Sequence, residues 1–166
     1  MHVLPADMSS HASLASAVEL AIPILPNGLD VLIVNGAYTN KEAAFLPPSA
    51  FASSSQAQAL HDDMHASLDT NVLGVVYSIN AFMPLILKGT LKKVVVISTG
   101  LADTEITIPT DGKDGNKVQL TYSSMKAALN MVVAKFAAEL KPKDIKLLAL
   151  SPGMREMTYR RAARAR

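Results

Sequence analysis

The sequence contains no cysteine and few aromatic residues, which make up 5% of its 166 positions. The lack of cysteine excludes a disulfide scaffold and a thiolate zinc site and fits a reducing compartment, so a cytoplasmic location is expected. The first residues lack the basic stretch and the apolar run of a secretory signal. The most apolar segment, 72–87, contains Asn80 and Pro84, so it is predicted to be a core helix rather than a membrane span.

Charge of either sign is scarce in most of the chain. The net charge is +2, but residues 155–166 alone hold five Arg and one Glu, so subtracting their charge of +4 leaves −2 for the remainder. A basic surface for nucleic acid would depend on this tail only, which has no interleaved aromatic residues and no reading motif. We therefore expect no nucleic-acid partner.

Three runs of strand length are almost continuously apolar, at 29–34, 93–98 and 145–150. Strands that are buried on both faces have this composition, whereas strands with one wet face alternate. We therefore predict a parallel sheet with helices on both faces, and residues 3–5 as a further strand stub. The hydrophobic content of 49% is enough for one domain with a single core.

Helical periodicity separates these strands, in apolar stripes over 14–22, 56–87 and 121–140. Alternating strands and helices joined by right-handed crossovers predict a doubly wound α/β fold, Rossmann-like in kind. One domain is expected over 1–153, followed by a basic tail at 154–166 that is disordered or a short helix. Ligands of such sheets bind beyond the carboxyl ends of the strands, so the segments after each strand are the candidate site.

Tyr122 and Lys126 are the sharpest local signal. They are four residues apart at the start of the third predicted helix, which places both on one helical face. A phenol is too weak an acid to exchange protons readily near neutral pH, but an ammonium one turn away stabilises the phenolate and lowers the pKa of the phenol. The pair therefore predicts Tyr122 as an acid/base and Lys126 as the group that tunes it, although the same spacing is also common on helices without any such function.

Four further segments accompany this pair in order along the chain. They are Asn35-Gly36-Ala37 after the first full strand, Asn71 in the long helix, Ser98-Thr99 after the second strand, and Pro152-Gly153 after the last one. Each alone has a structural explanation as a turn, a strand end or a polar residue in a helix. Together with Tyr122 and Lys126 they resemble the short-chain dehydrogenase/reductase family over about residues 3–153.

The resemblance implies an NAD(P)-dependent oxidoreductase that reduces a carbonyl or oxidises an alcohol on a small molecule. Tyr122 and Lys126 would be catalytic and contact the cofactor, Thr99 or its neighbour Ser98 would hold the carbonyl oxygen, and Asn71 would organise a water between Lys126 and solvent. The other implied cofactor contacts are Asp7, Asn35, Gly36, Ala37, Pro152 and Gly153. NADP is taken slightly ahead of NAD, and no metal is expected.

The sequence departs from the family at both ends. The Gly-rich turn that receives the pyrophosphate at a helix N-terminus, with the strand–helix–strand unit around it, has no counterpart here. We therefore expect a domain whose first βαβ unit is missing, which leaves its activity open. Tyr38 stands where the family has glycine, and the segment after Gly153 does not resemble the family's substrate lid. The substrate and the choice between NAD and NADP are consequently unreadable.

Other polar groups have plainer explanations. His61 and His65 are four residues apart with Asp62 and Asp63 between them, which is open to one metal ion. All four lie beside the predicted buried stripe, so a solvated face is expected instead. The acidic residues after the second strand are expected to be solvated or to rim the substrate pocket, and they are Asp103, Glu105, Asp111 and Asp114.

A non-catalytic function is the alternative. In the family the two long helices form the subunit interface, and here 56–87 and 121–140 carry apolar stripes and many alanines that allow close packing. The chain would then form a homo-oligomer, or associate with full-length relatives, without turning over a substrate.

Overall fold

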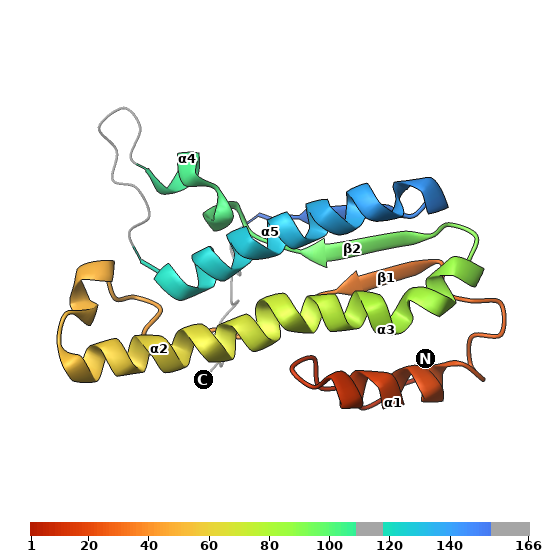
Figure 1. Ribbon diagram of the computed structural model, residues 1–166, viewed down its shortest axis with the longest axis horizontal. Helices are drawn as coiled ribbons and strands as arrows, with labels where there is room; N and C mark the ends of the chain where they lie inside the picture. Colours follow the sequence, from red (N-terminus) through yellow and green to blue (C-terminus); the bar gives the residue numbers. More distant parts are fainter. Residues whose placement is uncertain (109–117, 154–166) are drawn as a thin grey trace, which may run out of the picture.

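The computed structural model describes residues 1–108 and 118–153, in which helices and strands alternate (Figure 1). The helices are α1 His11–Ala21, α2 Ser54–Leu68, α3 Gly74–Lys88, α4 Thr104–Thr107 and α5 Leu120–Leu140, and the strands are β1 Val31–Val34, β2 Lys93–Ile97 and β3 Lys146–Leu150. Short 3-10 turns lie at Pro48–Phe51, Gly100–Ala102 and Lys141–Lys143, and a π-helical turn lies at Asp69–Leu73. Every main predicted element is present with small shifts at its ends, and the predicted basic tail lies outside the described residues.

The three strands form one parallel sheet in the order β1-β2-β3. Its register places Ile33 opposite Val95, and Val95 opposite Leu148. Because the strands run in the same direction, their carboxyl ends meet at one edge of the sheet. The predicted α/β arrangement with a parallel sheet is confirmed.

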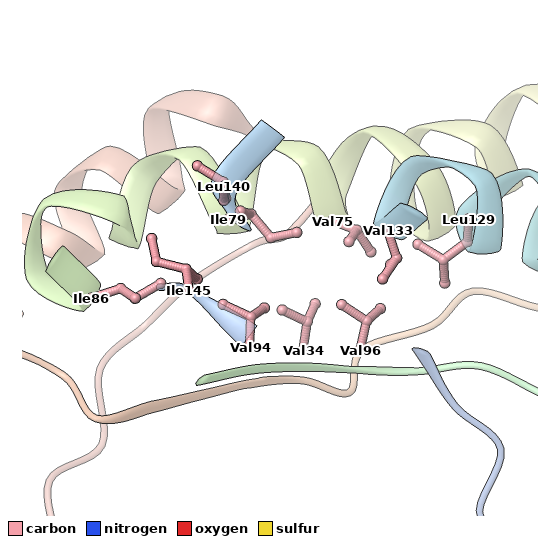
Figure 2. Packing of buried hydrophobic residues seen from close by; sticks show 10 residues of the cluster. All are labelled: Val34, Val75, Ile79, Ile86, Val94, Val96, Leu129, Val133, Leu140 and Ile145. Carbon is pink, nitrogen blue, oxygen red and sulfur yellow. The ribbon is translucent and has the colours of Figure 1, made fainter. Parts of the chain in front are cut away.

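The core lies between the sheet and the helices α3 and α5. Val34, Val94 and Val96 point from the strands toward the helices, where Ile79 and Leu129 meet them (Figure 2). Full burial of such a side chain stabilises the fold by about 1.5–3 kcal/mol. This layer therefore holds α3 and α5 in a fixed position above the sheet.

The opposite face of the sheet is uncovered in the described part of the chain. On that face Ile33, Leu148 and Leu150 keep 61%, 54% and 40% of their surface exposed. The remaining long helix, α1, packs against α3. Among the described residues, helices therefore cover one face of the sheet, and not both faces as the sequence predicts. The apolar composition of the strands indicates that both faces are suited to burial, but it does not indicate which segment covers each face.

Residues 3–5 form no strand. A strand needs a hydrogen-bonded neighbour, and β1, at the edge of the sheet, pairs with β2 alone. The segment after the expected stub is fixed in another way, since Met8 lies against Gly36 and Gly74. A Cβ on Gly74 would lie 2.8 Å from the Met8 carbonyl oxygen, so this close approach of backbone to helix requires glycine.

α2, the π turn and α3 form one continuous helix, Ser54–Lys88. By length and composition alone this helix could cross a membrane, which the sequence did not lead us to expect. Val75, Ile79 and Ile86 of the helix pack in the core against the sheet. Burial within the protein therefore explains much of its apolar character.

Candidate active site at the carboxyl edge of the sheet

The carboxyl ends of the strands bring together loops that are far apart in the sequence. Ser98 follows β2, and its amide donates to the Leu150 carbonyl at the end of β3 at 2.8 Å. Gly100 lies beside Ser151, because a Cβ at Gly100 would be 3.9 Å from the Ser151 hydroxyl oxygen. The segments that follow β2 and β3 therefore share one site.

Tyr122 and Lys126 lie on one face of α5, as their spacing predicts. Lys126 is only 3% exposed, and its Nζ donates to the Ile97 carbonyl oxygen at 2.8 Å. The same Nζ lies 5.8 Å from the centre of the Tyr122 ring. A buried ammonium needs hydrogen-bond partners, and the Ile97 carbonyl at the end of β2 is one of them. The structure thus brings the phenol ring and the ammonium together at the sheet edge.

Burial shifts the pKa of both groups. It raises the pKa of the Tyr122 phenol and lowers the pKa of the Lys126 ammonium, because each charged form loses solvation. The pKa of the phenol is therefore raised by loss of solvation, and the lowering expected from the neighbouring Lys126 is not found. The phenol is consequently protonated at neutral pH and is available as an acid.

Ser98 and Thr99 are neighbours in different environments. Ser98 is 6% exposed, and its hydroxyl donates to Asn130 Oδ1 on α5 at 2.6 Å. The Thr99 oxygen accepts the Leu101 amide at 3.2 Å and so caps the turn Gly100–Ala102. The Ser98 hydroxyl therefore donates within the protein, whereas the half-buried Thr99 hydroxyl donates to no described residue.

Asn71 lies in the π-helical turn and has no exposed surface. Its Oδ1 accepts the Tyr38 amide at 2.8 Å, and its Nδ2 donates to the Tyr38 carbonyl at 2.9 Å and to the Ser67 hydroxyl at 2.7 Å. Single π turns are frequent at functional sites. In this structure Asn71 ties the loop after β1 to the long helix, and its contact with a water near Lys126 stays a prediction.

The residues expected to contact only the cofactor are all exposed. They are Asp7, Asn35, Gly36, Ala37, Pro152 and Gly153. The Asp7 carboxylate accepts the Ser9 hydroxyl at 2.7 Å and the Ser9 amide at 2.9 Å, and these bonds lower the pKa of Asp7. Five of the six follow β1 or β3 directly, and Asp7 precedes Met8, which lies against Gly36. A ligand at this edge could therefore reach them.

An open pocket of about 260 Å³ lies between α4 and α5. Ser123 and Ala127 of α5 line one side of it, and Leu101 and Ile108 line the other. Asp103 is exposed and lines this pocket, and Glu105 is exposed, whereas Asp111 and Asp114 lie outside the described residues. Tyr122 does not line this pocket and instead lines a separate small cavity at the start of α5.

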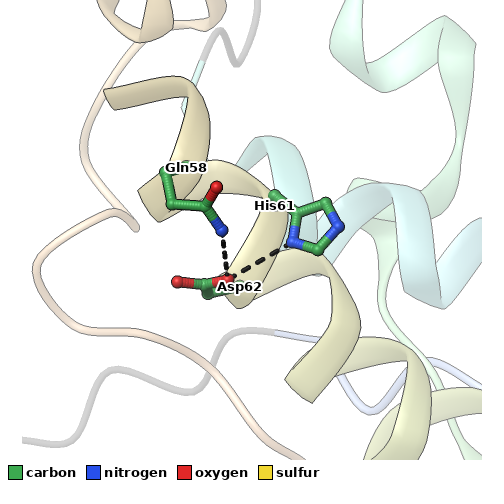
Figure 3. A network of polar contacts seen from close by, with 3 residues as sticks. All are labelled: Gln58, His61 and Asp62. Carbon is green, nitrogen blue, oxygen red and sulfur yellow. Dashed lines mark hydrogen bonds and ion pairs between the residues drawn. The ribbon is translucent and has the colours of Figure 1, made fainter. Parts of the chain in front are cut away.

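The outer face of α2 carries His61, Asp62 and His65, which are solvated as expected. Asp62 Oδ1 accepts from Gln58 Nε2 at 2.8 Å and lies 3.3 Å from His61 Nδ1, and both contacts lower the pKa of Asp62 (Figure 3). The rings of His61 and His65 are 4.2 Å apart. Within residues 1–108 and 118–153, no three metal-ligating side chains form a group suited to a metal ion.

The sequence did not predict the burial of Asp63 or the contact of Asn130 with Ser98. Asp63 is 5% exposed rather than solvated, because α2 turns its Asp63 and Ser67 face toward α5. Asn130 was not singled out, although it follows Lys126 by four residues and therefore shares its helical face. That spacing is the signal that could have found it, as it also relates Asp63, Ser67 and Asn71.

Comparison with known proteins identifies the family. The family model described as short chain dehydrogenase matches residues 1–166. The chain belongs to this family. It is 39% identical over 153 residues to the short-chain dehydrogenase/reductase atnB of Arthrinium sp, and 34% identical over 162 residues to the short-chain dehydrogenase/reductase iacC of Pestalotiopsis fici. These matches cover 92% and 96% of this chain but 55% and 57% of the relatives, so the chain spans about half their length.

Solved structures share the fold of this short-chain dehydrogenase domain. The NADPH-bound carbonyl reductase from chicken fatty liver matches with a TM-score of 0.71 and 22% identity, over 92% of this chain and 57% of that one. The putative carbonyl reductase Sniffer of Caenorhabditis elegans matches with a TM-score of 0.70 and 26% identity, over 92% and 63% of the two chains. Together with the parallel sheet, these matches establish an incomplete Rossmann-like α/β fold.

Proposed function

We propose that this chain carries the proton-transfer site of a cytoplasmic, NAD(P)-dependent oxidoreductase that interconverts a carbonyl and an alcohol on a small molecule. The observation that carries the proposal is the Tyr122 ring beside the buried Lys126 ammonium, at the sheet edge from which Thr99 emerges. Family membership supports the class of reaction. The pocket between α4 and α5 supports a small organic substrate rather than a polymer.

The residues present suit one half of a dinucleotide. Lys126 uses one of its three N–H groups on Ile97, which leaves two for the hydroxyl oxygens of a cofactor near Tyr122. Pyrophosphate binds in such folds at a Gly-rich turn before a helix N-terminus, and the sequence has no counterpart of that turn, while Ser10 and Ser53 already cap α1 and α2. We therefore expect the chain to hold the nicotinamide side and to bind the whole dinucleotide weakly, with NADP as the first form to test against NAD.

Each catalytic side chain has a distinct role in this proposal. The nicotinamide supplies a hydride to the carbonyl carbon when it is bound. Tyr122 donates its phenolic proton to the carbonyl oxygen, where negative charge develops, and Thr99 donates a hydrogen bond to the same oxygen. Lys126 stabilises the phenolate that remains until solvent restores its proton. Because burial raises the pKa of Tyr122, the phenol is protonated at neutral pH and can act as the acid in carbonyl reduction.

The test is turnover by the purified chain. NADPH and NADH are each supplied with a panel of small apolar aldehydes and ketones, and loss of the reduced nicotinamide is followed by absorbance. We expect turnover in the wild type, and a loss of at least about 100-fold in Tyr122→Phe with the fold unchanged. Tyr77→Phe is the matched control, since Tyr77 lies on α3 against His11 and outside the site. Turnover that is equal in wild type and Tyr122→Phe would contradict the proposal, as would flat calorimetric titrations with both cofactors.

A second candidate is a non-catalytic subunit that associates with copies of itself or with longer relatives. Met131 favours it, because this residue is 61% exposed in the middle of the long helix α5. A helix interface would cover Met131. Sedimentation of the chain alone, and then mixed with a longer relative, tests this candidate: Met131→Glu should abolish association while leaving the monomer folded.

A further inference from the structure

Asp63 on α2 is a buried carboxylate that has no hydrogen-bond partner within residues 1–108 and 118–153. It is 5% exposed, and its Oδ1 has neither a hydrogen bond nor contact with solvent. The salt bridges within the described part of the chain use the acids Asp62 and Asp144 instead. Burial of a polar group without a hydrogen bond is unfavourable, so a partner is expected in the space that Asp63 faces.

That space is a small cavity between α2, the loop after β1 and the start of α5. Its volume is about 10 Å³. Asp63 and Ser67 line it from α2, Thr39 lines it from the loop, and residues 119–122 line it from α5. A cavity of this volume is large enough for one water molecule and for little else.

The start of α5 has no cap of its own. Gln119 occupies the cap position with a left-handed φ of 62°, and no side chain of the described residues caps the first turn. The first amides of a helix are donors without helical partners, and they carry partial positive charge. The helix therefore presents donors to the same cavity to which Asp63 presents an acceptor.

These two groups select a neutral occupant. The helix N-terminus disfavours a cation and Asp63 disfavours an anion. Among the described residues, Tyr122 is the only other ionisable side chain that lines the cavity. A water molecule fits both groups, because it donates to Asp63 and accepts an amide of α5. Ser67 adds a further contact: its oxygen accepts Asn71 Nδ2 at 2.7 Å, which leaves its proton for the cavity.

We propose that Asp63 is a positioning residue that caps α5 through one buried water and so fixes the place of Tyr122. The helix-capping part stands on the structure alone, and only its importance for catalysis rests on the proposed function. Asp63 touches neither substrate nor cofactor in this account. It acts through the first turn of α5.

Hydrogen exchange tests the cap without any need for activity. In the full chain, Asp63→Asn keeps the size of the side chain but removes its charge and replaces one acceptor by a donor. We expect the amides of residues 120–123 to exchange about tenfold faster, while the middle of α5 is unchanged. Asp62→Asn is the matched control, because Asp62 is the exposed neighbour on the same helix, and it should leave exchange in α5 as in the wild type.

The titration of Tyr122 gives a second readout that a general loss of stability does not reproduce. Burial raises the pKa of Tyr122, so a loosened first turn should bring that pKa back toward its ordinary value in Asp63→Asn. Tyrosinate absorbance measures this shift, and Tyr122→Phe identifies the contribution of Tyr122 to the signal. Asp62→Asn should show no shift.

Asp63→Glu keeps a carboxylate in the cavity and should hold the exchange of residues 120–123 within about twofold of the wild type. If Asp63→Asn does not fold, this variant decides alone: retained protection supports the cap, and lost protection overturns it. Equal exchange and equal Tyr122 titration in Asp63→Asn and Asp62→Asn also overturn it. An inactive wild type with a sensitive first turn would instead refute the proposed function and leave the cap in place.

Discussion

The Nζ of Lys126 donates to the carbonyl oxygen of Ile97, the last residue of β2, at 2.8 Å. This bond fastens α5 to the edge of the sheet only two residues before Thr99. It also gives a buried ammonium a partner that does not titrate. The relative position of Tyr122 and Thr99 therefore depends on a bond from a side chain to the backbone rather than on an ion pair.

Lys126 and Tyr122 should change the free energy of unfolding with pH in opposite directions. The pKa of Lys126 is lowered in the folded state, so below the ordinary value of 10.5 the unfolded chain binds more protons and the free energy of unfolding rises with pH. The pKa of Tyr122 is raised, so above 10.0 the folded chain holds more protons and the free energy of unfolding falls with pH. Urea denaturation across this range should show the rise disappear in Lys126→Met and the fall disappear in Tyr122→Phe. An unchanged profile in Lys126→Met contradicts the burial of its ammonium.

Substitutions of Thr99 and Ser98 should have different effects, with Thr99 affecting turnover and Ser98 affecting stability. Thr99→Val removes the hydroxyl that is free to bind a carbonyl oxygen, so turnover should fall about 100-fold while the free energy of unfolding changes little. Ser98→Ala leaves Asn130 Oδ1 without its 2.6 Å donor and should lower the free energy of unfolding by about 1–3 kcal/mol with little effect on turnover. Thr99→Ser is the control that keeps the hydroxyl. If Ser98→Ala is the variant that loses turnover, the roles of the two residues are exchanged.

The sequence predicts those parts of the site that depend on local spacing. The pairing of Tyr122 with Lys126 follows from four residues of helix, and the meeting of the strand ends follows from a parallel sheet. The different surroundings of Ser98 and Thr99 do not follow, because the Ser98 hydroxyl donates to Asn130, which is 32 residues away along the chain. Tertiary packing decides such contacts.

Burial of polar residues is the other part that the sequence does not reveal. Asp63 lies beside an apolar stripe and is expected in solvent, but the approach of α5 buries it at 5% exposure. The sequence also does not predict the uncovered face of the sheet, because tertiary packing decides which surfaces are covered. The composition of β1 and β3 indicates two faces to cover, and it does not say that α1, α3 and α5 leave one of them bare.

The one-sided core predicts unequal effects for two leucines. Leu129 has no exposed surface and packs between α5 and the sheet, so Leu129→Ala should lower the free energy of unfolding by about 2–5 kcal/mol. Leu148 is 54% exposed on the bare face, so Leu148→Thr should change it by less than about 0.5 kcal/mol. Urea denaturation of both variants measures the difference. Equal losses would mean that the bare face is covered in solution.

Asn71 should contribute to stability through its shape and its donors together. Asn71→Asp keeps the shape but turns Nδ2 into an acceptor that faces two other acceptors, the Tyr38 carbonyl and the Ser67 hydroxyl oxygen. The Ser67 hydroxyl can rotate to donate instead, whereas the Tyr38 carbonyl cannot. We therefore expect Asn71→Asp to lower the free energy of unfolding by about 2–4 kcal/mol. Asn80→Asp, at an exposed position on the same continuous helix, should change it by less than about 0.5 kcal/mol.

A readout near Tyr38 separates this local effect from a general loss of stability. Because Asn71 holds both the amide and the carbonyl of Tyr38, exchange of the Tyr38 amide should accelerate in Asn71→Asp more than exchange in β2 does. The loop after β1 would then move away from the long helix while the sheet stays intact. If the two segments exchange faster by the same factor, Asn71 supports the whole domain rather than this loop, and its position beside the site has no local consequence.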